Sequence, residues 1–104
     1  MDSFKDREKG FEKNFVRDEE KLFKINARRN KYLAEWAFGK LNKNDLEKDI
    51  YIQEVIKSDF AEPGDEDVFK KIKADLNKAG FENIDDEIRN KMNETMERAK
   101  KDFS

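Results

Sequence analysis

The sequence has no cysteine and no histidine, and it has one proline and four glycines among 104 residues. Without cysteine the chain has no disulfide framework, no thiolate zinc site and no thiol nucleophile. The absence of histidine removes the commonest general base at neutral pH and the commonest transition-metal ligand. No apolar run has the length of a membrane span or of a signal peptide's hydrophobic region. We therefore expect a cytoplasmic protein that is not an enzyme, with no catalytic, cofactor or metal site and no direct membrane insertion.

The composition is that of a small, highly charged domain. Charged residues make up 46% of the chain and hydrophobic residues 36%, which is near the lower limit for a folded domain. Nine phenylalanines and one tryptophan compensate, because a few large rings can bury the area that many small side chains would otherwise supply. A chain of this length can form one core but not two.

The net charge of −2 conceals a separation of charge along the chain. Residues 21–41 carry six basic groups and one acidic group, whereas residues 42–67 carry three basic and nine acidic groups. A basic block followed by an acidic block favours two helices that attract each other. The overall balance does not indicate a nucleic-acid partner.

Apolar residues recur at helical spacing, and no segment alternates with a period of two. The pattern predicts a first helix that ends near Phe38 or Leu41, a second from Asn44 to Pro63-Gly64, a third from Asp65 to Gly80 and a fourth from Asp85. The short connections favour an all-α, four-helix bundle-like domain with a long first helix. The predicted inner faces are Leu46, Ile50, Ile56 and Phe60 in the second helix, Val68, Phe69, Ile72, Leu76 and Ala79 in the third, and Ile88, Met92, Met96, Ala99 and Phe103 in the fourth.

The first twenty residues have a different pattern from the rest. On a helix with about 100° per residue, Phe4, Phe11, Phe15 and Leu22 fall within roughly 20° of one line. A helix that faces a core usually shows an apolar arc of about 100° or more, and the arc reaches that width only from Leu22 onward. The narrow aromatic stripe is typical of a segment that lies in a partner's groove. Composition alone leaves open the alternative that the stripe folds back as ordinary core.

Two features weaken this segment as an isolated helix. Like charges four residues apart cost about 0.2–0.5 kcal/mol per pair, and Gly10 in the middle costs about 1 kcal/mol relative to alanine. We therefore expect residues 1–20 to be a partner-binding segment that is disordered when free and helical when bound, carried by a bundle domain of residues 21–104. The like charges that recur every four residues are Lys5, Lys9, Lys13, Arg17 and Lys21.

Two further clusters have competing interpretations. The basic residues 27–31, with Tyr32 and Trp36 beside them, could form a platform for a nucleotide or a single strand, or they could be a solvated face that pairs with the acidic second helix. The acidic residues Glu62, Asp65, Glu66 and Asp67 could bind a cation, but they lack the ligand spacing of a calcium loop. Acidic residues are expected at a helix N-terminus in any case.

Several strings of the sequence resemble a known family. Residues 11–15, 18–20, 27–31, 36–37 and 64–71 are similar, in register, to the zeta-subunit family of bacterial F-type ATP synthase inhibitors. The resemblance implies a four-helix protein whose N-terminal segment becomes helical in a catalytic α/β interface of the enzyme, near the γ stalk, and blocks ATP hydrolysis. We expect the free chain to be a monomer. The resemblance also implies contacts with the α, β and γ subunits, and a peripheral location at the inner membrane. The inhibitory residues that it implies, by motif position, are Phe4, Arg7, Phe11, Lys13 and Phe15.

A second hypothesis comes from a different functional class. The chain could be a general helical adaptor or a small-ligand (nucleotide) binding protein that uses Arg28, Arg29 and Trp36. In the inhibitor hypothesis the same three residues would be a secondary contact. The two hypotheses differ in the partners that they predict: the ATP synthase subunits in the first, and other partners or none in the second.

Overall fold

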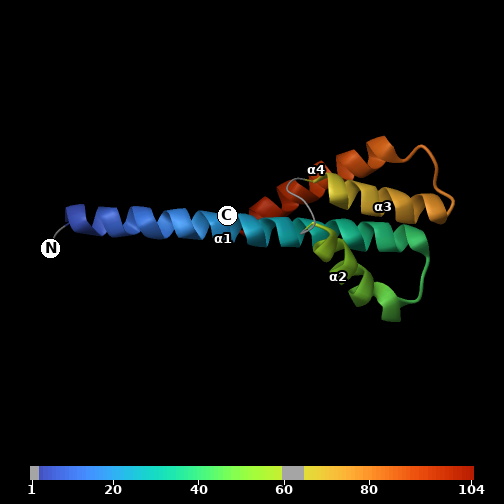
Figure 1. Cartoon of the computed structure of the whole chain (residues 1–104), viewed down its shortest axis with the longest axis horizontal. Coiled ribbons are helices and arrows are strands. Elements are labelled where there is room, and N and C mark those ends of the chain that lie inside the picture. The colour runs from blue at the N-terminus through green and yellow to red at the C-terminus, as the bar shows by residue number, and fades with distance from the viewer. Residues whose placement is uncertain (1–2, 60–64) are drawn as a thin grey trace.

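The computed structural model describes the backbone of residues 3–59 and 65–104, and the side chains of residues 19–59 and 65–104. It contains the helices α1 (Ser3–Leu41), α2 (Lys48–Ser58), α3 (Glu66–Lys78) and α4 (Asp85–Asp102), and the short 3₁₀ helix η1 (Asp45–Glu47) (Figure 1). No strand occurs within those backbone ranges. The all-α class, the four helices and the long first helix are confirmed. The disorder expected for residues 1–20 in the free protein stays a prediction.

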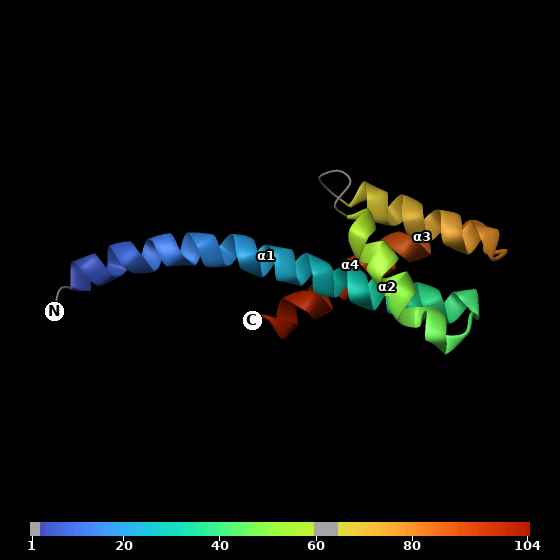
Figure 2. The ribbon, with the colours of Figure 1, turned by 60° about the horizontal axis from the view of Figure 1, so that its bottom comes forward.

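Helix α1 is the axis of the molecule, and it packs against all three of the other helices. Figures 1 and 2 show that α2, α3 and α4 surround only its C-terminal half, while its N-terminal half projects away from them. The molecule measures 63 × 28 × 24 Å and has a radius of gyration of 17.4 Å. A compact domain of this length would have a radius of gyration of about 13 Å. The projecting half of α1 accounts for this elongation.

The helix boundaries follow local signals in the sequence. After α1 the chain reverses at Asn42, which has a φ of 54°, in the left-handed region that asparagine tolerates. The Asn44 side chain then accepts a hydrogen bond of 3.0 Å from the backbone N–H of Leu46, as expected of an N-cap. Gly80, with a φ of 98°, ends α3 in a conformation that glycine adopts without strain. The end of α1 at Leu41 and the positions of Asn44 and Gly80 at helix ends are as the sequence predicted, but the helix that follows Asn44 is η1, and α2 begins only at Lys48.

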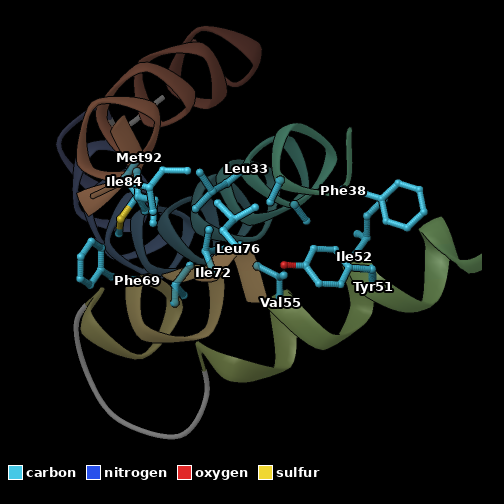
Figure 3. Packing of buried hydrophobic residues seen from close by; sticks show 14 residues of the cluster. Leu33, Phe38, Tyr51, Ile52, Val55, Phe69, Ile72, Leu76, Ile84 and Met92 are labelled. Carbon is cyan, nitrogen blue, oxygen red and sulfur yellow. The ribbon is translucent and has the colours of Figure 1, made fainter. Parts of the chain in front are cut away.

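The core lies between the C-terminal half of α1 and the other three helices. In Figure 3, Leu33 of α1 points toward Leu76 and Ile72 of α3, with Val55 of α2 beside them. All four of these side chains are fully buried. The rest of the core consists of Ala34, Ala37, Phe38, Tyr51, Ile52, Val68, Phe69, Ile84, Ile88 and Met92.

The predicted inner face of the second helix was wrong. Leu46 and Ile50 are 85% and 63% exposed, and the buried residues of α2 are Tyr51, Ile52 and Val55. The segment begins with a 3₁₀ turn, which rotates about 120° per residue instead of 100°. The side chains that follow therefore point in other directions than a regular α-helix from Asn44 would give them. Both sides of α2 also carry apolar residues, and periodicity alone cannot choose between them. Ile56 packs partly buried against the core, Phe60 and Pro63-Gly64 lie outside the described residues, and α2 already ends at Ser58.

The inner faces of the other two helices are mostly as predicted. Val68, Phe69, Ile72 and Leu76 are buried in α3, and Ile88, Met92 and Ala99 are buried in α4. Ala79 is exposed instead, because α3 has already ended at Lys78 and Ala79 is its C-cap. Met96 and Phe103 are only half-buried. Thr95 is buried in this stretch of α4, and its hydroxyl donates a 2.6 Å hydrogen bond to the carbonyl of Lys91.

Candidate partner-binding surface

The part of α1 that projects from the bundle is the candidate partner-binding surface, and we call residues 3–24 the arm. Every described side chain of the arm, from Glu19 to Lys24, is exposed, and Ile25 is the first buried residue among the described side chains of α1. Leu22 and Phe23 are 57% and 58% exposed. The sequence predicted that α1 enters the core at Leu22. In the structure it enters at Ile25, about one helical turn later.

The residues that the family resemblance marks as inhibitory all belong to the arm. Phe4, Arg7, Phe11, Lys13 and Phe15 lie within the continuous helix α1, and their side chains lie outside the described residues. The unbroken helical backbone preserves the spacing on which the predicted aromatic stripe depends. The role of these five residues stays a prediction.

The arm begins where the last turn of α4 is fastened to α1 by a cluster that we call the latch (Arg28, Tyr32, Asp102 and Phe103). The Arg28 guanidinium lies 3.3 Å from the Asp102 carboxylate and donates a 3.5 Å hydrogen bond to the Tyr32 hydroxyl. The Tyr32 hydroxyl donates to the same carboxylate, and Arg28 also lies 5.2 Å from the centre of the Phe103 ring. The hydrogen bond and charge interaction with Tyr32, with a further contribution from the Asp102 carboxylate, raise the pKa of Arg28. The latch therefore holds the end of the bundle close to Ile25.

A buried polar network joins α1 to both ends of the connection between α2 and α3. The Arg29 side chain, which is 1% exposed, donates a 2.9 Å hydrogen bond to Asp65 and a 2.6 Å hydrogen bond to Asn30. Asn30 in turn donates a 3.2 Å hydrogen bond to Asp59. Asp65 is the N-cap residue of α3 but makes no side-chain capping bond, and its carboxylate contacts Arg29 instead. This network fixes two polar α1 residues inside the domain, where an unpaired charge would be costly.

The structure separates the three residues of the possible secondary contact. Arg29 is buried in the network above, Arg28 belongs to the latch, and Trp36 lies half-buried on another part of α1. The basic cluster therefore does not form a single exposed platform in this conformation. The sequence predicted that this basic cluster pairs with the acidic residues 42–67. Arg29 does so through Asp65, but Arg28 pairs with Asp102 of α4 instead.

Trp36 lines a surface depression of about 570 Å³ between α1 and α4. The guanidinium of Arg98 lies over the Tyr32 ring, 3.8 Å from its centre, a distance at which a cation is attracted to an aromatic face. The sequence analysis missed Arg98. Its spacing from Lys91 and Lys101 on the polar side of α4 was visible in the sequence, but their approach to Tyr32 and Trp36 depends on helix packing. The full lining is Tyr32, Trp36, Lys91, Glu94, Thr95, Glu97, Arg98 and Lys101.

The other polar clusters join helices to one another. Tyr51 of α2 donates a 2.9 Å hydrogen bond to Asp75 of α3, and Lys71 contacts both Asp75 at 3.0 Å and Glu54 at 3.2 Å. Burial, together with the hydrogen bond to Asp75, raises the pKa of Tyr51. These contacts hold α2 against α3. Among the side chains that the structure describes, no group of acidic residues is arranged to hold a metal ion.

None of the helices described is both long and apolar enough to cross a membrane. The charged residues that recur along α1 are sufficient to explain this for the longest helix.

Comparison with known proteins yields one family. The family model described as ATPase inhibitor subunit zeta matches residues 1–102, which include the arm and all four helices. The match confirms the resemblance drawn from the sequence. None of the curated proteins compared with the chain matches it.

Proposed function

Because the chain belongs to the ATPase inhibitor subunit zeta family, we propose that it inhibits ATP hydrolysis by the F-type ATP synthase through its arm. The exposed arm is the single observation that carries this proposal, since residues 19–24 extend beyond the bundle with every described side chain accessible. An exposed helix with an aromatic stripe suits insertion into a groove. The groove that we propose is a catalytic α/β interface near the γ stalk, so that the inserted helix obstructs rotation in the direction of hydrolysis.

The stripe and the basic residues of the arm would contribute in different ways. Burial of a phenylalanine side chain is worth about 1.5–3 kcal/mol, so Phe4, Phe11 and Phe15 would supply most of the affinity. The basic residues that recur every four positions would mainly steer the encounter, because exposed charges act on association rates more than on affinity. Ordering the arm costs about 1–2 kcal/mol per residue in backbone entropy, which keeps the net binding reversible.

The bundle would set how far the arm enters. An arm of 22 residues is about 33 Å long as a helix, and the bundle begins abruptly where α4 is latched to α1 at Arg28. A groove that accepts one helix cannot also accept four, so insertion would stop near Ile25. In this proposal the bundle contacts the outer surface of the α, β and γ subunits, and the protein lies at the membrane only through that complex.

Removal of residues 1–18 tests the proposal. Among the side chains that the structure describes, none before Ile25 belongs to the core, so the shortened chain should keep the helical content of residues 19–104 in circular dichroism. It should no longer inhibit ATP hydrolysis by the soluble catalytic head, whereas the full chain should inhibit. If the shortened, folded chain inhibits as strongly as the full chain, the arm is not the inhibitory element.

The depression beside Trp36 favours a second candidate function, the binding of a small anionic ligand with a planar ring, such as a nucleotide. Its walls combine the rings of Tyr32 and Trp36 with the cations of Arg98, Lys91 and Lys101, which outnumber the carboxylates of Glu94 and Glu97, although Lys91 lies 3.0 Å from Glu94. Trp36 is the only tryptophan of the chain, so its fluorescence would report binding in a titration with ATP. Saturable quenching that Arg98→Ala removes would support this function, and no response at millimolar ATP would exclude it.

A further inference from the structure

The end of α4 is attached to α1 apart from the main core. Ile25 of α1 and Ala99 of α4 are buried, at 8% and 0% exposed, but neither is part of the core cluster that the structure describes around Leu33. Phe103 follows Ala99 on the same side of α4 by helical spacing, and it is half-buried. Figures 1 and 2 show this end of α4 beside the middle of α1, directly before the projecting half. We call residues 96–104 the strap.

Polar residues separate this small contact from the main core on both helices. On α1, the buried residues between Ile25 and Leu33 are Arg29 and Asn30, which belong to the buried polar network. On α4, the buried residue before the strap is Thr95, whose hydroxyl donates a 2.6 Å hydrogen bond to the carbonyl four residues earlier. A bond of this kind weakens and often bends a helix. The strap can therefore detach at Thr95 while the main core stays packed.

The contacts that hold the strap are mostly exposed. Its nine residues include one buried side chain, Ala99. The ion pair between Asp102 of the strap and Arg28 of α1 joins side chains that are 32% and 41% exposed, and exposed pairs of this kind contribute little to stability. Arg98 adds a contact over the Tyr32 ring. Segments with few buried contacts open at a lower free energy than the whole domain, so the strap opens more often than the bundle unfolds.

Opening of the strap exposes the turn of α1 that continues the arm. Ile25 lies about 60° from the line of Leu22 on a regular helix, at the edge of the predicted stripe. Arg28 loses its carboxylate partner and gains a free guanidinium. Residues 25–28 lengthen the exposed helix by about 6 Å. The network at Arg29 then limits the exposed part, because that side chain is bonded to the start of α3.

We infer that the strap covers this turn in the free chain and opens when the arm binds its partner, so that Ile25 and Arg28 join the binding surface. The inference rests on the proposed function. With the strap closed, insertion stops near Ile25, whereas with the strap open the partner's groove extends to the network at Arg29. The part of the groove that receives this turn offers an apolar side chain and a carboxylate, the chemistry that complements isoleucine and arginine.

The strength of the latch therefore regulates inhibition. A partner that needs the open form binds with an affinity proportional to the fraction of chains whose strap is open. A weaker latch raises that fraction and gives tighter inhibition. Loss of Ile25 also opens the strap, but it removes one of the side chains that the partner contacts, so inhibition becomes weaker. Opposite effects from two changes that both open the strap are specific to this inference.

Hydrogen exchange on the free, full-length chain tests whether the strap opens by itself. Amides of residues 98–103 should exchange together, more slowly than the arm but about 100-fold faster than Ile88. Arg28→Ala should speed their exchange and leave Ile88 nearly unchanged. Arg89→Ala is the matched control, because Arg89 has similar exposure (43%) and pairs with Glu66 of α3 at 2.8 Å, and it should leave the strap unchanged.

Two outcomes of this experiment would overturn the inference. Equal exchange in the strap and at Ile88 would mean that the strap opens only when the bundle unfolds. Exchange that rises gradually toward Ser104 and does not respond to Arg28→Ala would be ordinary fraying of a helix end.

Inhibition of ATP hydrolysis by the soluble catalytic head tests what the opening does. Asp102→Asn weakens the latch and keeps both α1 residues, so it should inhibit at about threefold lower concentration than the wild type. Ile25→Ser should require a concentration at least about threefold higher. Glu66→Gln is the matched control, because it weakens the corresponding pair with Arg89 and should inhibit like the wild type. Circular dichroism should show the same helical content in all three variants.

The result with Asp102→Asn decides the inference. Unchanged or weaker inhibition by this variant would overturn it, because the closed strap would then belong to the inhibitory form. Inhibition by Ile25→Ser equal to that of the wild type would also overturn it. Absence of inhibition by the wild type would contradict the proposed function and not the opening of the strap, which the exchange rates of the free chain decide.

Discussion

The two halves of α1 have the same helical pattern and opposite environments. Leu22 and Leu33 lie on nearly the same line of the helix, yet Leu22 is 57% exposed and Leu33 is fully buried. The difference comes from where the neighbouring helices end, because the last turn of α4 is fastened to α1 at Arg28 and every described side chain from Glu19 to Lys24 is exposed. The apolar stripe is therefore core in one half of the helix and available to a partner in the other half.

The two halves also differ in what stabilises them. In the bundle, α1 packs against three helices, and its buried Arg29 and Asn30 have hydrogen-bond partners. In the described part of the arm, residues 19–24, every side chain is exposed, and an isolated helix of this length is marginal in water. The bundle should therefore respond to mutations through its stability, and the arm through its binding.

Substitutions in the arm should have the largest effect of those considered, and they should change the rates of binding to the catalytic head. Phe11→Ala with Phe15→Ala removes two burials worth about 1.5–3 kcal/mol each, so the dissociation rate from the catalytic head should rise by about 100-fold or more. Lys9→Ala with Lys13→Ala should instead lower the association rate at low salt and have little effect at high salt. Stopped-flow binding measures both rates. Equal salt dependence of the two double variants would contradict the assignment of affinity to the phenylalanines and of steering to the lysines.

Leucines on the same line of α1 provide a matched pair for stability. Leu33→Ala leaves a cavity in the core and should lower the free energy of unfolding by about 2–5 kcal/mol. Leu22→Ala changes an exposed side chain and should lower it by less than about 0.5 kcal/mol. Urea denaturation followed by circular dichroism gives both values. Similar losses in the two variants would show that the arm is packed like the bundle.

The neighbouring arginines provide a second pair with a smaller difference. Arg29→Ala leaves Asp65 and Asn30 without their partner, and we expect a loss of about 1–3 kcal/mol in the free energy of unfolding, moderated because Asp65 is half-exposed. Arg28→Ala breaks a more exposed latch contact and should cost less than about 1 kcal/mol. Thermal or urea unfolding distinguishes the two. A larger loss for Arg28→Ala would mean that the latch, and not the buried network, stabilises the bundle.

Much of the fold was predictable because its helix ends carry local signals. Asn44 caps η1, and Gly80 follows α3 in a conformation that glycine adopts without strain. Asp65 and Asp85 lie at the N-terminal ends of α3 and α4, where acidic residues are favoured by the helix dipole. The buried face of α2 was not predictable, because both of its sides are apolar and a 3₁₀ turn shifts the phase at Leu46.

The candidate surface was predictable in kind but not in extent. The narrow stripe separated the N-terminal segment from the core helices, but only tertiary packing shows that the arm continues to Lys24. The latch joins residues separated by 74 positions in the sequence, and Arg29 meets a carboxylate 36 positions away. No pattern within one helix identifies such partners, so the burial of Arg29 could not be anticipated.

Hydrogen exchange on the chain, free and bound to the soluble catalytic head, tests the division between arm and bundle most directly. In the free protein, amides of residues 3–18 should exchange quickly and those from Ile25 onward slowly, since exchange reports local opening. In the complex, protection should rise in the arm and stay nearly unchanged in the core around Leu33. Protection of Phe11 and Phe15 in the free chain equal to that of Leu33, or protection gained in the bundle alone, would contradict the account.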